Sequence, residues 1–343
     1  MTDLLNYSST LQLISQSEKI SIISHINPDG DSIGATLALY IYLSKKGLKV
    51  QVIAPSAIPG FLKWMPEISD IIIGNRQKEK AETILQSSDL IICVDFNSTN
   101  RAGKLSDVLK NSKAKKILID HHPNPVVEEF DSIISKTETS STSELVYDFI
   151  VFSGDNNLID KNIASCIYTG IITDTGSLSY NCNHVSSYHA VADLLSLGID
   201  GASIHDKIYN ENTEDRIRLL GHCLKNRMVV NTDLSFAYIY LTTDDLNQFN
   251  YRIGDTEDVV NIPLSIKGIH LSALFTEREE HIRLSLRSKG EFSVNDFVRK
   301  YFEGGGHKNA AGANSYVSME KTIEIFEDAV LANKELIINS AER

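Results

Sequence analysis

The stretch KISIISHINPDGDS (residues 19–32) decides the fold, because an apolar run leads directly into an acidic loop. Lys19–Ser24 has the composition of a buried strand, and His25, Asp29 and Asp31 follow it in the loop. The residues after the loop have the apolar spacing of a helix. A strand, a polar loop and a helix in this order are typical of an open α/β sheet, in which ligands bind beyond the carboxyl ends of the strands.

Three further apolar runs deliver polar side chains in the same way. They are Leu90–Val94 with Asp95, Ile117–Ile119 with Asp120, His121 and His122, and Thr169–Ile172 with Thr173 and Asp174. Carboxylates gathered at one sheet edge repel one another, and burying them unpaired is costly. A pair of divalent metal ions is the simplest compensation. Because the clusters hold carboxylates and imidazoles but no cysteine, they favour Mn²⁺, with Mg²⁺ or Co²⁺ as substitutes.

Each of these features alone has a plainer interpretation. His25 alone is typical of a solvated loop, Asp29-Gly30 and Asp174-Thr175-Gly176 are typical of turns, and Asp95 fits a helix cap. Adjacent imidazoles such as His121-His122 have little structural use at a sheet edge. The joint occurrence of four acidic clusters at the ends of strands or helices favours the metal site.

The composition sets the broad class of the protein. A chain of 343 residues is long enough for two domains. The net charge of −12 argues against long duplex nucleic acid, which usually requires a basic face, and favours a short or small anionic substrate. The four cysteines form no C-x-x-C pair, so we expect reduced, buried thiols. We find no signal peptide and no membrane-spanning apolar run, so we expect a cytoplasmic enzyme without a membrane partner.

The first half of the chain alternates strand and helix patterns, which predicts a doubly wound, mainly parallel α/β sheet. The predicted strands are Lys19–Ser24, Lys49–Ile53, Asp70–Ile73, Asp89–Val94 and Lys116–Ile119. Helical spacing predicts helices over Ser32–Lys46, Lys78–Ser87 and Ala102–Lys110, with Asp31 or Ser32 as the N-cap of the first.

A mostly helical region follows, and the pattern becomes β-rich after Met228. Helices are predicted over Ser143–Tyr147, Ile163–Ile172, Val185–Leu197, Ala202–Tyr209, Thr213–Asn226, Val294–Tyr301 and Met319–Leu336, and strands over Leu234–Leu241, Ile269–Thr276 and His281–Arg287. We therefore predict a domain with the metal site over residues 1–185, a helical connector over 186–227 and a smaller α/β domain over 228–343.

A second candidate site lies in the last part of the chain. Gly304, Gly305 and Gly306 give a backbone that can approach an anion closely, with N–H groups free to point at it. His307 and Lys308 add side-chain donors at the same place. A bare glycine run is typical of a flexible turn, but the adjoining histidine and lysine favour phosphate or nucleotide binding.

The chain resembles the DHH phosphoesterase superfamily at five motifs in the order of that family. Four are His25–Ser32, Val94-Asp95, Asp120–His122 and Thr169–Asp174, and the fifth, Glu303–Gly312, is similar to the signature of the partner domain called DHHA1. Within the superfamily, the chain looks most like the nanoRNase branch. Members of that branch are oligoribonucleases that also remove the 3′-phosphate from 3′-phosphoadenosine 5′-phosphate.

The resemblance implies a role for each residue of these motifs. It assigns His25 and Asp29 to a first metal ion, Asp31, His121 and Asp174 to a second, and Asp95 to both. Asp120 would orient its neighbours, and His122 would reach the scissile phosphate. Arg101, which follows the Asp95 motif, is expected to meet phosphate, although its position also fits a solvated residue at a helix start.

In the second domain, the resemblance implies that the glycine run binds substrate together with His307 and Lys308. Arg287 and Ser288, at the end of a predicted strand, would also contact substrate. Arg283 lies four residues earlier and could share the face of Arg287.

The activity that the resemblance implies is metal-dependent hydrolysis of short oligoribonucleotides to nucleoside 5′-monophosphates, with 3′-phosphate removal as a second activity. One alternative is a phosphodiesterase for a cyclic dinucleotide or its linear product. An alternative of another class is a nucleotide-binding sensor without turnover, which the complete ligand set argues against. The expected partners are short oligonucleotides, dinucleotides and phosphorylated nucleotides, and analogy allows a homodimer.

Overall fold

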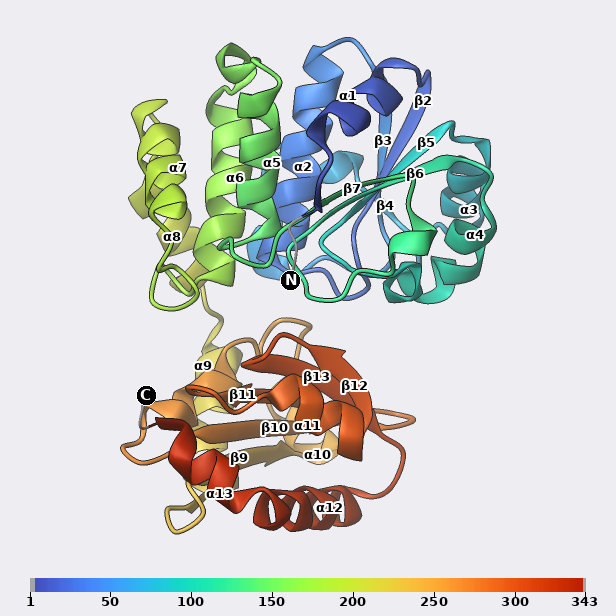
Figure 1. The fold of residues 1–343 in the computed structure, drawn as a ribbon. Helices are drawn as coiled ribbons and strands as arrows, with labels where there is room; N and C mark the ends of the chain where they lie inside the picture. Colours follow the sequence, from blue (N-terminus) through green and yellow to red (C-terminus); the bar gives the residue numbers. More distant parts are fainter. Residues whose placement is uncertain (1–3, 342–343) are drawn as a thin grey trace. The chain divides into compact units, whose positions relative to one another are not determined.

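The computed structural model describes residues 4–341 and divides the chain into two units, Met1–Glu211 (unit 1) and Asn212–Arg343 (unit 2). Each has its own sheet and core (Figure 1). The division falls inside the predicted connector, residues 186–227, and the predicted domain boundaries stay predictions. Residues 1–3 lie outside the described part. They begin the segment in which we looked for a signal peptide. None of the described helices is both long and apolar enough to cross a membrane.

The sheet of unit 1 confirms the predicted doubly wound, mainly parallel arrangement. Among the described residues, its strands lie side by side in the order β1 (Leu4–Leu5), β7 (Ser132–Ser135), β6 (Lys115–Asp120), β5 (Leu90–Val94), β2 (Lys19–Ile23), β3 (Lys49–Ala54) and β4 (Ile72–Ile73). Only β1 pairs antiparallel, with β7. The chain order reverses between β2 and β5, and such a switch point is where open α/β sheets bind ligands.

The continuous apolar runs form strands that are buried on both faces. In β5, Leu90, Ile92 and Val94 belong to one core, and Ile91 and Cys93 belong to a second core on the opposite face. Successive side chains of a strand point to opposite faces. A strand without polar residues therefore needs apolar packing on each face, and β5 has a hydrophobic core on both faces.

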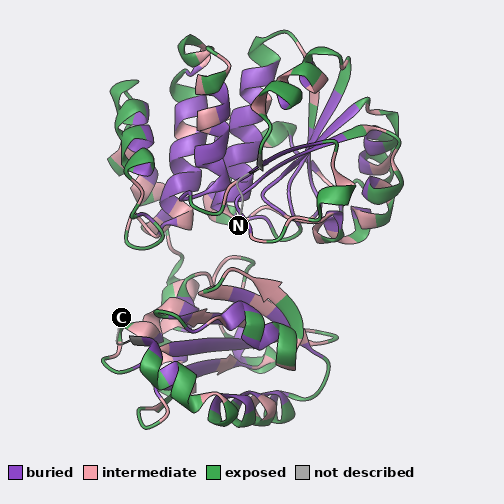
Figure 2. Cartoon of the chain, viewed as in Figure 1, coloured by how far each residue is buried: buried purple, intermediate pink, exposed green. Residues whose placement is uncertain are grey.

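Two layers of helices supply this cover (Figures 1 and 2). One layer consists of α1 (Tyr7–Ser15), α2 (Gly30–Lys45), α5 (Thr142–Phe152), α6 (Lys161–Asp174), α7 (Val185–Ser196) and α8 (Gly201–Tyr209), and the other of α3 (Lys78–Ser87) and α4 (Ser106–Asn111). Short 3₁₀ helices cover Gly60–Leu62, Ile68–Asp70, Thr99–Leu105, Val127–Glu129 and Asn156–Leu158.

Unit 2 is a mixed sheet with helices on both faces. Among the described residues, its strand order is β12 (Glu303–Gly306), β13 (Ala310–Ser315), β11 (Ile282–Ser288), β10 (Leu271–Glu277), β9 (Phe236–Leu241) and β8 (Met228–Asn231), and only β9 and β10 are parallel. One face packs on α11 (Val294–Tyr301), α12 (Met319–Ala332) and α13 (Lys334–Ile338). The other packs on α9 (Glu214–His222), a π-helical turn (Cys223–Arg227), α10 (Thr243–Gln248) and a 3₁₀ helix (Val259–Ser265). A last 3₁₀ turn covers Asn339–Ala341.

Sequence patterns did not indicate β1, β7, β8, β12 or β13 among the described strands. β12 and β13 consist mainly of glycine, alanine and small polar residues, which have low intrinsic preference for strands. They form strands because each pairs with a neighbour in the sheet. The glycine run is therefore part of an edge strand rather than a flexible turn, which corrects the plainer interpretation given to it.

Glycines let α2 and α6 cross closely. A Cβ at Gly34 of α2 would lie 2.5 Å from the carbonyl oxygen of Cys166 and 3.0 Å from the backbone nitrogen of Gly170, both in α6. A Cβ at Gly170 would overlap the hydroxyl of Ser143 and lie 2.8 Å from a carboxylate oxygen of Asp31. The crossing thus brings the beginnings of α2 and α5 close to α6.

Gly34→Ala should destabilise the protein by about 1–3 kcal/mol, because the added methyl group meets backbone that cannot give way. Denaturant unfolding of the parent and the variant measures this. Gly221→Ala is the matched control, since Gly221 is also helical but a Cβ there meets no atom within 4 Å. The control should be neutral or stabilising by up to about 1 kcal/mol. Equal effects of the two changes would contradict the close crossing.

Candidate metal centre

The predicted metal ligands of unit 1 gather at one end of its sheet. His25 follows β2, Asp95 follows β5 and His121 follows β6, so they lie at the carboxyl ends of three adjacent parallel strands. β2 and β5 flank the switch point. The apolar run that precedes Asp174 belongs to the predicted helix over Ile163–Ile172, and Asp174 is the last residue of that helix, α6.

The first loop enters α2 differently from our prediction. Asp29, rather than Asp31 or Ser32, is the N-cap: its carboxylate accepts the N–H of Ser32 at 2.9 Å, and the Ser32 hydroxyl bonds back to the N–H of Asp29. This capping box starts the helix two residues earlier than the apolar spacing indicated. Asp31 therefore lies in the first turn of α2, where it is buried.

One group of side chains, which we call the His25 cluster, comprises His25, Asp29 and Asp95. The Nε2 atom of His25 lies 3.6 Å from Oδ2 of Asp29 and 3.4 Å from Oδ2 of Asp95. The Nδ1 atom of His25 lies 2.8 Å from the carbonyl oxygen of Ile26. A proton on Nδ1 would be donated to that carbonyl, which leaves Nε2 as a ligand atom and fixes the ring.

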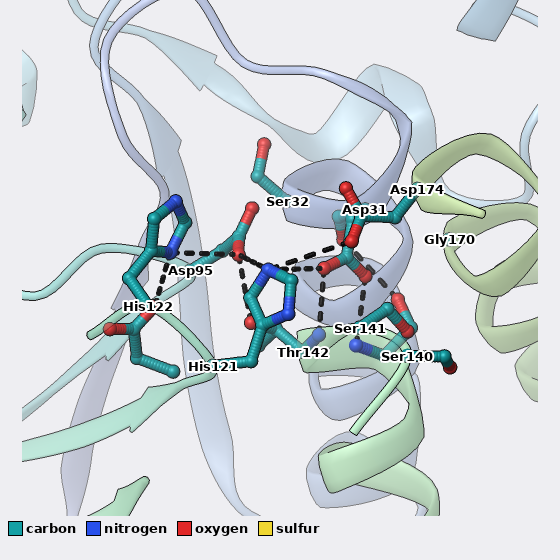
Figure 3. A network of polar contacts seen from close by, with 12 residues as sticks. Asp31, Ser32, Asp95, His121, His122, Ser140, Ser141, Thr142, Gly170 and Asp174 are labelled. Atoms are coloured by element: carbon teal, nitrogen blue, oxygen red, sulfur yellow. Dashed lines mark hydrogen bonds and ion pairs between the residues drawn. The ribbon is translucent and has the colours of Figure 1, made fainter. Parts of the chain in front are cut away.

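A second group, which we call the His121 cluster, comprises Asp31, Asp95, His121 and Asp174 (Figure 3). The Nε2 atom of His121 lies 3.6 Å from Oδ1 of Asp95, 3.6 Å from Oδ2 of Asp174 and 3.9 Å from Oδ2 of Asp31. Asp95 belongs to both clusters and presents a different oxygen to each. Its backbone is left-handed, with φ 66°, a conformation that is costly for most residues but tolerated by aspartate.

These separations fit a shared cation better than hydrogen bonds. Two ligand atoms each about 2.1 Å from one ion lie between about 3 and 4.2 Å apart, depending on the angle between them. The nitrogen–oxygen distances in the two clusters run from 3.4 to 3.9 Å, longer than ordinary hydrogen bonds. The residues therefore fit two divalent metal ions that share Asp95.

The electrostatics of the centre point the same way. Burial and the charge of Asp95 raise the pKa of Asp31 well above its usual range, and burial also raises the pKa of Asp174. Burial lowers the pKa of His25, but the two neighbouring carboxylates outweigh it and bring the pKa to about 10. The raised pKa values mean that these side chains bind protons more readily, because the centre lacks positive charge. Two divalent cations would match the four carboxylates of the clusters.

His122 and Asp120 form a pair beside the two clusters. The Nδ1 atom of His122 lies 2.7 Å from Oδ1 of Asp120 and 3.7 Å from Oδ1 of Asp95. Burial lowers the pKa of His122 well below its usual value, and the charge of Arg101 contributes to this shift. Asp120 therefore holds the ring of His122, and Arg101 lies near enough to act on the same group.

Sequence reasoning missed the contribution of α5. The backbone N–H groups of Thr142 and Ser143 donate to the carboxylate of Asp31, and the hydroxyl of Thr142 donates to Asp95. A signal was present in the sequence: Ser141 and Glu144 have the spacing of a capping box, which marks a helix N-terminus. Nothing local in that signal, however, indicates which distant carboxylates the N-terminus meets.

The predicted substrate residues of unit 2 lie on neighbouring strands and the turn between them. Arg287, on β11, pairs across the sheet with Ala310 of β13. His307 and Lys308 lie in the turn that joins β12 and β13, in which Ala310 N–H donates to the carbonyl of His307. Arg287 is therefore adjacent to the turn, and the substrate role of these residues stays a prediction.

Other predicted substrate residues form hydrogen bonds or ion pairs within unit 2. The hydroxyl of Ser288 donates to the carbonyl of Phe292 at 2.6 Å, and Lys308 pairs with Glu291 at 2.6 Å. The N–H of Gly306 donates to the side chain of Asn295 at 2.9 Å, so our expectation that the N–H groups of Gly304, Gly305 and Gly306 are free is wrong for Gly306. A Cβ at Gly304 would overlap the carbonyl oxygen of Gly312, so this glycine permits close strand packing.

The fold and the paired clusters define a divalent-metal protein of the doubly wound α/β class. The family model for the DHH family, N-terminal domain, matches residues 19–171, and the model for the DHHA1 domain matches residues 233–332. The chain belongs to the DHH family, and the resemblance drawn from its motifs is confirmed.

Three of the proteins that are similar to this chain carry different descriptions. The bifunctional oligoribonuclease and PAP phosphatase NrnA of Bacillus subtilis (strain 168) is 25% identical over 327 residues, covering 95% of this chain and 98% of the relative. The cyclic-di-AMP phosphodiesterase GdpP of the same organism is 26% identical and covers 93% of this chain but 48% of the relative. The crystal structure of an exopolyphosphatase-related protein from Bacteroides fragilis is 42% identical, with a TM-score of 0.91 and 97% coverage of both chains.

Asp95→Asn should weaken metal binding at both clusters, because it removes the charge that they share while keeping the shape of the side chain. Asparagine also tolerates the left-handed backbone. In the parent, Mn²⁺ at about 100 times its Kd should stabilise the fold by about 2.7 kcal/mol per site. Thermal unfolding with Mn²⁺ and with a chelator measures this difference, which should largely disappear in the variant.

Asp258→Asn is the matched control for that experiment. Asp258 is also left-handed, with φ 63°, and lies in unit 2 outside both clusters. This variant should keep the full Mn²⁺-dependent gain in stability. If Asp95→Asn kept it as well, Asp95 would not be a shared ligand.

Proposed function

We propose that the protein hydrolyses short oligoribonucleotides to nucleoside 5′-monophosphates and also removes the 3′-phosphate of 3′-phosphoadenosine 5′-phosphate. The observation that carries this proposal is Asp95, whose Oδ2 faces His25 while its Oδ1 faces His121. Similarity to the oligoribonuclease and PAP phosphatase of B. subtilis along almost the whole of both chains supports the substrate class.

We assign the ligands to two ions as the clusters group them. His25 and Asp29 would hold the first ion, Asp31, His121 and Asp174 the second, and Asp95 both. We propose Mn²⁺, with Mg²⁺ or Co²⁺ as substitutes, because the donors are oxygens and imidazoles. When bound, such a pair of ions activates water and stabilises charge on the attacking and leaving oxygens of an in-line displacement.

The neighbouring side chains would handle the charge of the scissile phosphate. Asp120 fixes the ring of His122 through Nδ1, and we assign the contact with the substrate to Nε2. Burial lowers the pKa of His122, whereas an adjacent phosphate would raise it and favour the protonated form. His122 would then donate from Nε2 to a non-bridging oxygen, and Arg101 would offset charge on the same group.

In unit 2, we propose that Arg287 and His307 provide the side-chain donors for the nucleotide. Ser288 and Lys308 would support them from the same end of the sheet, where Ser288 donates to Phe292 and Lys308 pairs with Glu291. We also propose that the backbone of Gly304 and Gly305, in the edge strand, takes part in substrate binding.

A cyclic-dinucleotide phosphodiesterase is the second candidate, favoured by the similarity to GdpP. The chain spans about half of that relative's length, so the likeness covers only part of the relative. A binding protein without turnover is the third candidate. The complete pair of ligand clusters argues against it, because a sensor has no need for two cations at a phosphate.

Turnover of a substrate panel should separate these candidates. With Mn²⁺, we expect mononucleotide release from pApA and from a five-nucleotide RNA, and phosphate release from 3′-phosphoadenosine 5′-phosphate. We expect kcat/KM for a cyclic dinucleotide to be at least about tenfold lower, because a ring offers no chain end. Preferred cleavage of the cyclic compound would support the second candidate, and tight binding without any product would support the third.

His307→Ala should weaken substrate binding more than metal binding. Loss of one hydrogen bond to a charged phosphate costs about 1.5–3 kcal/mol, so we expect KM for pApA to rise at least about tenfold. His281→Ala is the control, since His281 lies at the opposite end of β11 from Arg287. Equal affinity of parent and His307→Ala for a non-hydrolysable dinucleotide would remove His307 from the site.

A further inference from the structure

The N-terminus of α5 is bonded to two of the proposed metal ligands. The N–H of Thr142 donates to Oδ2 of Asp31 at 2.7 Å, and the N–H of Ser143 donates to Oδ1 at 2.8 Å. The hydroxyl of Thr142 donates to Oδ1 of Asp95 at 2.8 Å. All four residues are at most 2% exposed, so these bonds lie in a medium that strengthens them.

The three bonds act on one cluster more than on the other. Asp31 belongs to the His121 cluster. The oxygen of Asp95 that Thr142 contacts, Oδ1, is the one 3.6 Å from His121 (Figure 3). The other oxygen, Oδ2, faces His25. Every bond from the beginning of α5 therefore reaches a ligand of the His121 cluster.

A shared carboxylate needs such a support. The χ2 torsion of aspartate has a broad energy profile, so its plane is not fixed by the side chain itself. The Thr142 hydroxyl fixes one oxygen of Asp95 and thereby the direction of both. Without that bond, the Asp95 carboxylate could turn about χ2, which moves both of its oxygens. The His121 cluster is affected most, because Oδ1, the oxygen that faces His121, is the one that loses its hydrogen bond.

The beginning of α5 is itself held in place. The buried carboxylate of Glu144 accepts hydrogen bonds from the N–H and the hydroxyl of Ser140 and from the hydroxyl of Ser187, at the start of α7. Ser141 caps the helix by accepting the N–H of Glu144. Thr142 is thus set by contacts that do not involve the clusters.

We propose that Thr142 is a positioning residue that sets the affinity of the second ion, the one held by the His121 cluster, and affects the first ion much less. This inference rests on the two-ion site of the proposed function. Groups that support metal ligands typically contribute 10- to 100-fold to metal affinity, and here that contribution falls on one of two adjacent ions.

Titration of the metal-free protein with Mn²⁺, followed by calorimetry and by the electron paramagnetic resonance of free Mn²⁺, tests this. The parent should bind two ions. Thr142→Val keeps the volume and the branching but removes the hydroxyl, so one ion should bind about 10- to 100-fold more weakly and the other should be weakened much less. Thr142→Ser keeps the hydroxyl and should bind both ions like the parent.

Thr139→Val is the matched control. Among the described residues, Thr139 is a buried threonine of the same segment whose hydroxyl has no hydrogen-bond partner. Its replacement should leave both affinities unchanged, which separates loss of the specific bond from loss of a buried hydroxyl.

The outcomes separate this inference from the proposed function. A parent that bound fewer than two ions would overturn the two-ion site and the inference with it. A parent with two ions would overturn the inference alone if Thr142→Val weakened neither ion or both equally, or if Thr142→Ser behaved like Thr142→Val. Circular dichroism checks folding, and Thr142→Ala takes the place of Thr142→Val if the latter does not fold.

Discussion

The concentration of carboxylates in a buried site is the constraint on which the rest of the structure depends. Asp31 and Asp95 are almost completely buried, and the His25 and His121 clusters meet at Asp95. Such a group is tolerable only with matching positive charge close by. The imidazoles supply part of it, while burial and the charge of Asp95 raise the pKa of Asp31. Affinity for divalent cations follows from this charge balance.

The sheet turns that constraint into a defined geometry. Residues at the carboxyl ends of β2, β5 and β6 are fixed by strands that are covered on both faces, so the loops begin from rigid positions. The reversal of strand order between β2 and β5 lets the chain leave in opposite directions there. His25 and Asp95 can therefore approach each other from adjacent strands without a connection crossing between them.

Much of this could be predicted from the sequence because several of the ligands lie just after an apolar run. Pattern alone placed His25, Asp95 and His121 at strand ends, and the structure brings them together. The support from Thr142 could not be predicted, since it joins residues 111 positions apart and local patterns carry no such information. The same holds for β12 and β13, whose small residues become strands only through their neighbours.

Two helix ends meet the His121 cluster with opposite effects. The N-terminus of α5 carries partial positive charge and binds both oxygens of Asp31, so it fixes that carboxylate and lessens its need for a cation. Asp174 is the last residue of α6, where the helix dipole adds negative charge to the carboxylate. In the proposed site, Asp174 would therefore attract the ion, and Asp31 would determine where the ion is held. Because attraction and position come from different helices, a change at the beginning of α5 can alter the geometry of this cluster without changing its charge.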